Sequence, residues 1–310
     1  MKKVNVLWTG GFDSTFRVTQ LSRMDVEIEP YYLSDGRLSE EYELNAIMEI
    51  TEYLEGLNET KAKFLPMVYY TLDELEKDDE IADALSKVLE NDYLGGQYRY
   101  LGTFSKMYPG IELSVHKDDK AIMVIKKYGA LRKVRDETIG EYYVLDESKS
   151  PDYLIELFKN YHFPLVDYTK KQIKKEYNDY GLKEVISKTW FCHKPIRGKP
   201  CGYCNSCMYT IEEGLYERFG ILALIRFSLR KIGVYSLPKR YSKWKLNAKR
   251  LSYFLKRDSK KYFRYVRRDL SKYSRIGLKR SLKLLRRDVV KYPKMIKKDL
   301  KQYIEFFKTH

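Results

Sequence analysis

Glycines and hydroxyl side chains follow directly on a short apolar stretch, residues 4–8, near the start of the chain. Such a stretch is typical of a buried strand, and Asp, Ser and Thr after glycines are typical of a helix start. Strand, glycine turn and helix N-terminus together favour phosphate binding, because glycines let backbone N–H groups approach an anion and the helix end adds partial positive charge. The predicted phosphate loop consists of Thr9, Gly10, Gly11, Phe12, Asp13, Ser14 and Thr15.

Two common nucleotide loops do not fit this stretch. No Gly-Lys-Ser/Thr ending closes it, which excludes a Walker loop, and the third glycine of the dinucleotide fingerprint is missing. A tight turn without a ligand is the alternative interpretation. The hydroxyl before the glycines and the Asp-Ser-Thr after them favour the phosphate site.

All four cysteines lie in one short segment with the spacing C-x8-C-x2-C-x2-C. A CxxC turn places two thiolates on one side of a loop, and four thiolates form a closed ligand set for structural zinc. An iron–sulfur cluster and four free buried thiols are the alternatives. His193 adjoins the cluster, and we expect it to be a bystander. The predicted metal ligands are Cys192, Cys201, Cys204 and Cys207.

The charge of the chain is divided unevenly. Residues 221–310 hold 29 Lys and Arg against five Asp and Glu, whereas residues 1–220 carry a net charge of −8. The length of 310 residues allows one large domain or two ordinary ones. With no secretory leader or membrane-spanning run in the sequence, we expect a soluble, cytoplasmic protein.

Alternating apolar patterns predict an α/β fold with a parallel sheet. In such a sheet ligands bind at the carboxyl ends of the strands, where the phosphate loop would lie. Thr169 is expected to cap a helix that ends before Gly181. The predicted strands are residues 4–8, 26–33, 66–70 and 111–115, with an added pair at 121–125 and 142–145, and the predicted helices are 16–21, 40–57, 72–89, 151–161 and 169–180.

The phosphate loop resembles the Ser-Gly-Gly-x-Asp-Ser loop of the ATP pyrophosphatases, the PP-loop, with Thr9 in place of the first serine. Other motifs resemble one family that carries this loop, the 7-cyano-7-deazaguanine synthases of queuosine biosynthesis. These motifs are Tyr32-Leu33-Ser34-Asp35-Gly36-Arg37 with Glu43-Leu44, Pro164-Leu165 with Thr169-Lys170, Thr189-Trp190-Phe191-Cys192, and Pro200-Cys201-Gly202-Tyr203-Cys204-Asn205-Ser206-Cys207.

The resemblance implies a Rossmann-like PP-loop domain over residues 1–220 with a four-cysteine zinc site at its end, followed by a basic helical extension over 221–310. It implies that ATP phosphates bind on Thr9 to Thr15, that the Ser14 and Thr15 hydroxyls contact them, and that Asp13 helps to hold Mg²⁺. The backbone at Leu33 would contact the adenine. Lys170 would stabilise the leaving phosphate, although an ordinary exposed lysine is the alternative.

In this family, ATP activates the carboxylate of 7-carboxy-7-deazaguanine, ammonia displaces the activated group, and a second ATP-dependent dehydration gives the nitrile. Because every cysteine is assigned to the metal, none remains for persulfide chemistry, and we expect C–N ligation rather than sulfur transfer. A homodimer is expected. The family's substrate motifs are reduced to Gln97-Tyr98-Arg99 and to residues 114–119, which favours a member recruited to another acceptor.

The basic region repeats the pattern Arg-Asp-x-x-Lys-Tyr at 257–262, 268–273 and 287–292, with a looser copy at 298–303. A step of 11 residues, as between 257 and 268, keeps the repeated residues on one helical face. Such a face suits nucleic acid or a partner protein, and a membrane surface is less favoured. The alternatives to a small-molecule ligase are therefore a PP-loop enzyme that modifies a macromolecule and a nucleotide-binding interaction protein without turnover.

Overall fold

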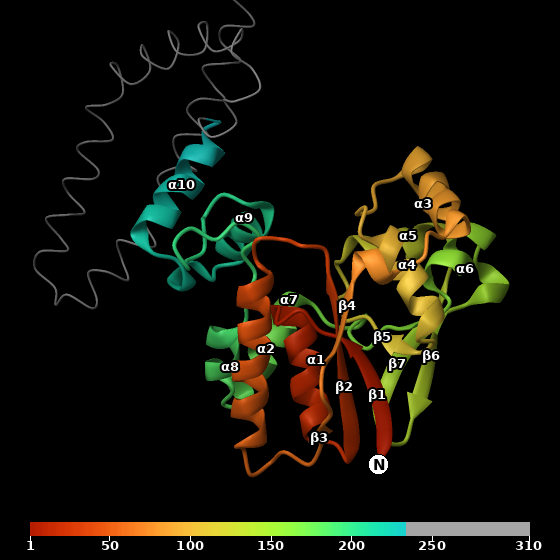
Figure 1. Cartoon of the computed structure of the whole chain (residues 1–310), viewed down its shortest axis with the longest axis horizontal. Helices are drawn as coiled ribbons and strands as arrows, with labels where there is room; N and C mark the ends of the chain where they lie inside the picture. The colour runs from red at the N-terminus through yellow and green to blue at the C-terminus, as the bar shows by residue number, and fades with distance from the viewer. Residues whose placement is uncertain (234–310) are drawn as a thin grey trace, which may run out of the picture. The chain divides into compact units, whose positions relative to one another are not determined.

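The computed structural model describes residues 1–233, and the repeats at 257–303 lie outside the described residues. The chain divides into two units, Met1–Phe191 and a second that begins at Cys192 (Figure 1). The phosphate loop belongs to the first unit and the four cysteines to the second. The predicted division at residue 220 stays a prediction.

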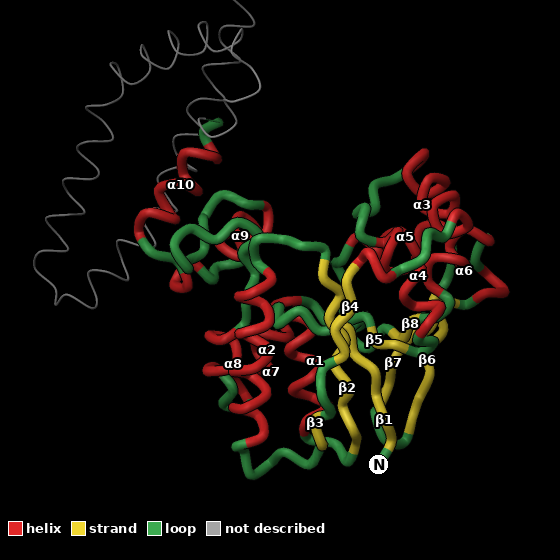
Figure 2. Tube along the Cα trace, in the orientation of Figure 1, coloured by secondary structure: helices red, strands yellow, loops and turns green. Residues whose placement is uncertain are grey.

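The first unit is built on a six-stranded sheet (Figure 2). Its paired strands all run parallel. Its strands are β1 (Lys2–Leu7), β2 (Val26–Ser34), β3 (Lys63–Phe64), β4 (Val68–Thr71), β5 (Ile111–Glu112) and β8 (Tyr161–His162). The strand order is β3-β2-β1-β5-β8. Strand β3 pairs with the first half of β2, and β4 pairs with residues 31–34 further along β2. Val4 lies opposite Ile28 and Val6 opposite Glu112, so β1 is central, as its buried apolar side chains require.

Helices cover both faces of this sheet (Figure 1). One face carries α1 (Phe12–Ser22), α2 (Glu40–Glu55), α7 (Lys170–Asp179) and α8 (Lys183–Lys188), and the other carries α3 (Asp79–Asn91), α4 (Tyr98–Met107), α5 (Lys120–Tyr128) and α6 (Asp152–Phe158). Successive residues of β1 serve opposite faces, because Val6 packs with the first group of helices and Leu7 with the second. The predicted α/β class with a parallel, Rossmann-like sheet is confirmed.

One predicted strand is wrong. Residues 121–125 lie in helix α5, where Asp119 caps the N-terminus by accepting a hydrogen bond from the Ala121 N–H at 2.8 Å. The apolar run is buried at helical spacing, which a short run cannot reveal by itself. Residues 142–145 do form a strand, β7 (Gly140–Leu145), but it pairs antiparallel with β6 (Leu131–Asp136), which the sequence analysis missed.

The local signals at the two ends of α7 were interpreted correctly. Thr169 caps α7, with its hydroxyl accepting from the Gln172 N–H at 3.3 Å, and Gly181 follows the helix with a φ of 72°. The segment 72–89 is divided, since a 3₁₀ turn η1 (Leu72–Glu74) precedes α3. Helix α1 begins earlier than predicted, at Phe12, with Gly11 in the N-cap position.

The second unit contains short helices around the cysteines. They are α9 (Asn205–Glu212), the 3₁₀ turn η3 (Tyr216–Arg218) and α10 (Ile221–Lys231). The first unit contains one more 3₁₀ turn among the described residues, η2 (Glu147–Lys149). Within the described part of the chain, every helix is too short or too polar to cross a bilayer.

Candidate nucleotide and metal sites

The phosphate loop connects β1 to α1 and is held against the start of α2. Gly10 adopts a left-handed φ of 64°, and a Cβ there would lie 2.8 Å from the Glu43 carbonyl oxygen and 3.1 Å from the Ala46 Cβ. Only glycine combines this backbone conformation with so close a contact. The loop therefore delivers the chain into the N-terminus of α1, whose first turn carries N–H groups without helical partners, as an anion site requires.

Trp190 completes this loop from a distant part of the first unit. Its backbone N–H donates a 2.8 Å hydrogen bond to the Gly10 carbonyl oxygen. Its ring stacks on Tyr42 of α2, with the ring centroids 4.7 Å apart. The segment just before Cys192 thus fixes the conformation of the phosphate loop, a contact that the sequence analysis did not foresee.

The polar side chains of the loop differ in their exposure. Asp13 and Ser14 are half-buried in the first turn of α1. The side chain of Thr15 is fully buried, and its hydroxyl accepts a 3.0 Å hydrogen bond from the Trp8 indole N–H. Thr15 therefore ties the helix start to the end of β1. Its predicted contact with phosphate stays a prediction.

Three further loops leave the sheet at the same edge, because β1, β2, β5 and β8 are parallel. The loop after β5 is joined to the loop after β8 by a 2.9 Å hydrogen bond from the Lys117 N–H to the Tyr168 carbonyl oxygen. Lys170 follows as the first residue of α7 and is half-buried. The edge of the sheet thus brings together the loops that carry the predicted phosphate and catalytic residues.

A buried carboxylate organises the loop after β2. Glu43 accepts hydrogen bonds from the Tyr32 hydroxyl at 2.9 Å and from the Ser39 hydroxyl at 2.7 Å. The Arg37 guanidinium lies 3.7 Å from the same carboxylate and donates to Asp35 at 2.7 Å. Burial, and then the Glu43 charge, raise the pKa of Tyr32 well above its usual range, so Tyr32 remains a donor. Leu33, the predicted adenine contact, lies buried in this strand end.

The four cysteines converge in the second unit as predicted. All four are buried, and their sulfur atoms lie within 4.8 Å of one another. The Cys201 and Cys207 sulfurs are 3.7 Å apart. Four ligands at Zn–S distances of about 2.3 Å around a tetrahedral ion would lie about 3.8 Å apart. The donor set and its spacing therefore fit a metal ion bound by four thiolates.

His193 lies beside this cluster without joining it. Its side chain is exposed and forms a 2.6 Å hydrogen bond with the Ser206 hydroxyl.

Backbone N–H groups of Tyr203 and Cys204 donate to the Cys201 sulfur at 3.4 and 3.2 Å. Such donors stabilise a thiolate, the form that binds metal.

Helix α10 packs directly on the CxxC turn. A Cβ at Gly202, whose φ is 80°, would lie 2.0 Å from the Ala223 carbonyl oxygen. Arg226 donates a 2.9 Å hydrogen bond to the Cys201 carbonyl oxygen, and Arg230 donates to Asn205 at 2.7 Å. The first turns of the basic region are therefore part of the cysteine unit, and these two arginines serve its folding.

Comparison with known proteins gives a match over part of the chain. Residues 156–217 match the family described as queuosine biosynthesis protein QueC. This segment includes Lys170, Trp190 and the four cysteines. No curated protein matches the chain. A solved structure titled as a predicted subunit of tRNA methyltransferase from Methanocaldococcus jannaschii is 14% identical, with a TM-score of 0.31 over 69% of this chain and 88% of that chain.

Proposed function

We propose that this protein is an ATP-dependent C–N ligase that activates a carboxylate, as the 7-cyano-7-deazaguanine synthases do, with 7-carboxy-7-deazaguanine or a related acid as substrate. The observation that carries the proposal is the Trp190–Gly10 hydrogen bond. It joins the segment that matches the QueC family to a glycine loop that lies outside the matched residues 156–217.

The residues at the carboxyl edge of the sheet have different roles in this reaction. Backbone N–H groups of the loop bind the phosphates of ATP, and the half-buried Asp13 helps to hold Mg²⁺, which supplies charge neutralisation of the triphosphate. The substrate carboxylate attacks the α-phosphate of ATP and releases pyrophosphate, or attacks the γ-phosphate and releases ADP. Ammonia then attacks the activated carbonyl carbon and loses a proton, AMP or phosphate leaves, and the amide forms. Lys170 stabilises the charge on the AMP or phosphate that leaves. A second ATP-dependent dehydration of the amide would give the nitrile.

The metal has a structural role in this proposal. Zinc suits the four buried thiolates better than an iron–sulfur cluster does, because their sulfur atoms lie within 4.8 Å of one another, close enough to bind a single ion. Bound zinc would supply folding free energy to the second unit. No step of the reaction passes through it.

Mass spectrometry of a reaction with full-length protein, ATP, Mg²⁺, ammonium and 7-carboxy-7-deazaguanine tests this proposal. We expect the amide or the nitrile to form, and pyrophosphate or phosphate to be released. Asp13→Asn should abolish product, whereas Asp25→Asn, at an exposed position after α1, should not. Unchanged deazapurine with the wild-type protein would refute this substrate.

The charge of residues 221–310 favours a second candidate, a PP-loop enzyme that acts on a macromolecule held by this region. Nucleic acid is the partner that 29 Lys and Arg with interleaved tyrosines suit best. ATP cleavage that requires added RNA or DNA, with the free deazapurine left unchanged, would favour this candidate over the first.

A further inference from the structure

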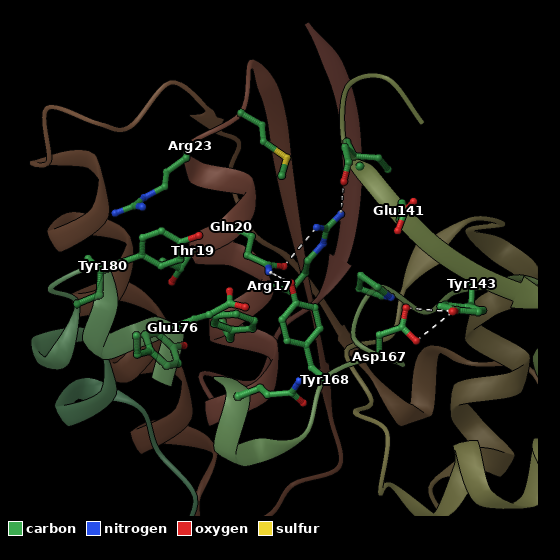
Figure 3. Close-up of a pocket in the computed structure, with 18 residues that line it drawn as sticks. Arg17, Thr19, Gln20, Arg23, Glu141, Tyr143, Asp167, Tyr168, Glu176 and Tyr180 are labelled. Atoms are coloured by element: carbon green, nitrogen blue, oxygen red, sulfur yellow. Dashed lines mark hydrogen bonds between the residues drawn. The ribbon is translucent and has the colours of Figure 1, made fainter. Parts of the chain in front are cut away.

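Several polar side chains line a cavity of about 780 Å³ in the first unit (Figure 3). Some of these groups already bond to one another. The Tyr143 hydroxyl donates to Asp167 at 3.0 Å, and the Gln20 side-chain amide donates to the Tyr168 hydroxyl at 3.2 Å. These contacts join the β6–β7 hairpin and α1 to the loop before α7, so they stabilise the first unit from within.

Helix α10 of the second unit, in contrast, exposes apolar side chains along one face (Figure 1). Ile221, Leu222 and Ile225 are 42%, 68% and 42% exposed, and Leu229 is half-buried. At the spacing of an α-helix these four side chains lie within about 100° of one another around the helix axis. They form one continuous surface, the apolar stripe of α10.

The opposite face of α10 is packed against the cysteines. Ala223, Leu224 and Phe227 are buried, and they lie on the far side of the helix from the apolar stripe. The Ala223 carbonyl oxygen occupies the space of a side chain at Gly202 in the CxxC turn. Because this face is fixed, α10 cannot rotate to bury its stripe, and a contiguous exposed apolar surface of this kind marks an interaction site.

The cations of α10 itself are held within the second unit. Arg226 and Arg230 form the hydrogen bonds described above, and Lys231 forms an ion pair with Glu212. Positive charge for a partner comes instead from the sequence that follows, since residues 234–310 hold 26 Lys and Arg against five Asp and Glu. The stripe is thus joined in sequence to a strongly basic region.

An anionic lipid bilayer combines the two properties that suit this surface. Its headgroups attract clustered Lys and Arg, and the boundary between headgroups and acyl chains accepts the apolar face of a helix that lies in the membrane plane. Nucleic acid would satisfy the charge but would leave the stripe in water. We propose that the apolar stripe of α10 binds the surface of an anionic bilayer, to which residues 234–310 supply the electrostatic attraction.

Flotation of the full-length protein with lipid vesicles, in the absence of ATP, tests this proposal. Vesicles of phosphatidylcholine with about 30% phosphatidylglycerol should bind the protein, whereas pure phosphatidylcholine should bind it about a hundredfold more weakly, because the headgroup charge is missing. Raising the salt from about 0.1 M to 0.5 M should weaken the binding without abolishing it, because salt screens the charges and not the apolar contact.

A variant that combines Leu222→Ser and Ile225→Ser should bind the anionic vesicles about tenfold more weakly or less, because two apolar side chains no longer enter the lipid. The matched control combines Met48→Ser and Met123→Ser, which replace side chains 63% and 54% exposed on α2 and α5. It should bind as the wild type does. Both variants should keep the urea unfolding curve and the metal content of the wild type, since all four positions face solvent.

Four results would overturn the proposal. Equal vesicle binding by the wild type and the Leu222→Ser, Ile225→Ser variant would remove the stripe from the contact, and a large loss of stability in that variant would show that the stripe packs within the chain. A wild-type dimer that dissociates in that variant, measured by light scattering, would assign the stripe to a second copy. Binding of RNA without binding of vesicles would assign the basic region to nucleic acid. Since neither ATP nor a deazapurine is present, these results do not depend on the proposed ligase reaction.

Discussion

The Trp190 backbone N–H and the Gly10 carbonyl oxygen are joined by a 2.8 Å hydrogen bond that spans 180 positions of the chain. Gly10 is fixed on its other side by α2, whose Glu43 carbonyl oxygen occupies the space of a side chain. The phosphate loop is therefore shaped by two contacts remote in sequence. Its conformation depends on the packing of the whole first unit.

Replacing Gly10 by alanine should disrupt the loop. The left-handed φ alone costs about 1–2 kcal/mol for a residue with a Cβ. The overlap with the Glu43 carbonyl oxygen should add about 1–3 kcal/mol. Urea unfolding and ATP titration should show lower stability and weaker nucleotide binding.

Gly36→Ala is the matched control for this stability loss. Gly36 has a similar φ of 67°, but nothing lies within 4 Å of the added methyl group. It should show the backbone cost without the overlap. Equal losses of stability in the two variants would mean that the contact with α2 is unimportant.

Lys170→Ala should slow product formation about a hundredfold, if its ammonium group stabilises the leaving phosphate. Lys171→Ala, at the next and exposed position of α7, should retain the wild-type rate. Initial rates at saturating ATP measure the difference. Equal rates for both variants would remove Lys170 from the reaction.

The parts of the fold that the sequence predicted correctly depend on local signals. The hydroxyl of Thr169 and the backbone freedom of Gly181 define the ends of α7 without reference to the rest of the chain. Similarly, a CxxC turn brings two thiols together by its own geometry.

The parts that were missed depend on tertiary contacts. Residues 121–125 contain only apolar side chains, and burial on one helical face, with the Asp119 cap, decided between strand and helix. The Trp190–Gly10 contact joins segments that lie far apart in the sequence.

Gly202→Ala should separate α10 from the CxxC turn of the second unit. The added methyl group would overlap the Ala223 carbonyl oxygen, so the CxxC turn and the helix cannot both keep their positions. We expect faster zinc loss to a chelator, measured with a colorimetric zinc indicator. Gly214→Ala has a φ of 88° with nothing within 4 Å, and should lose zinc at the wild-type rate.

Acidification should destabilise the first unit through His162. Burial lowers the pKa of its imidazole below the usual value of 6.5, and the ring stacks on Tyr142 at 4.2 Å. Below pH 6.5 the His162 imidazole takes up a proton in the unfolded chain but not yet in the folded chain. The free energy of unfolding therefore decreases as the pH falls from 6.5 through the lower pKa that His162 has in the folded chain. Urea unfolding between about pH 7.5 and pH 5, measured at one ionic strength, should show this loss of stability.

His162→Gln should reduce that pH dependence, because the titrating group is removed. If His162→Gln and the wild type lose stability in parallel on acidification, another group is responsible.

The ion pair between Arg17 and Glu112 is buried in the centre of the first unit, with side-chain exposures of 4% and 0%. Arg17→Met alone should destabilise the unit by about 3–5 kcal/mol, because it leaves the Glu112 carboxylate buried without its partner. The double variant Arg17→Met, Glu112→Met should recover most of this loss, since two apolar side chains replace both charges. Urea unfolding of the wild type, both single variants and the double variant measures the coupling. Additive losses would show that the two side chains stabilise the fold independently, through packing alone.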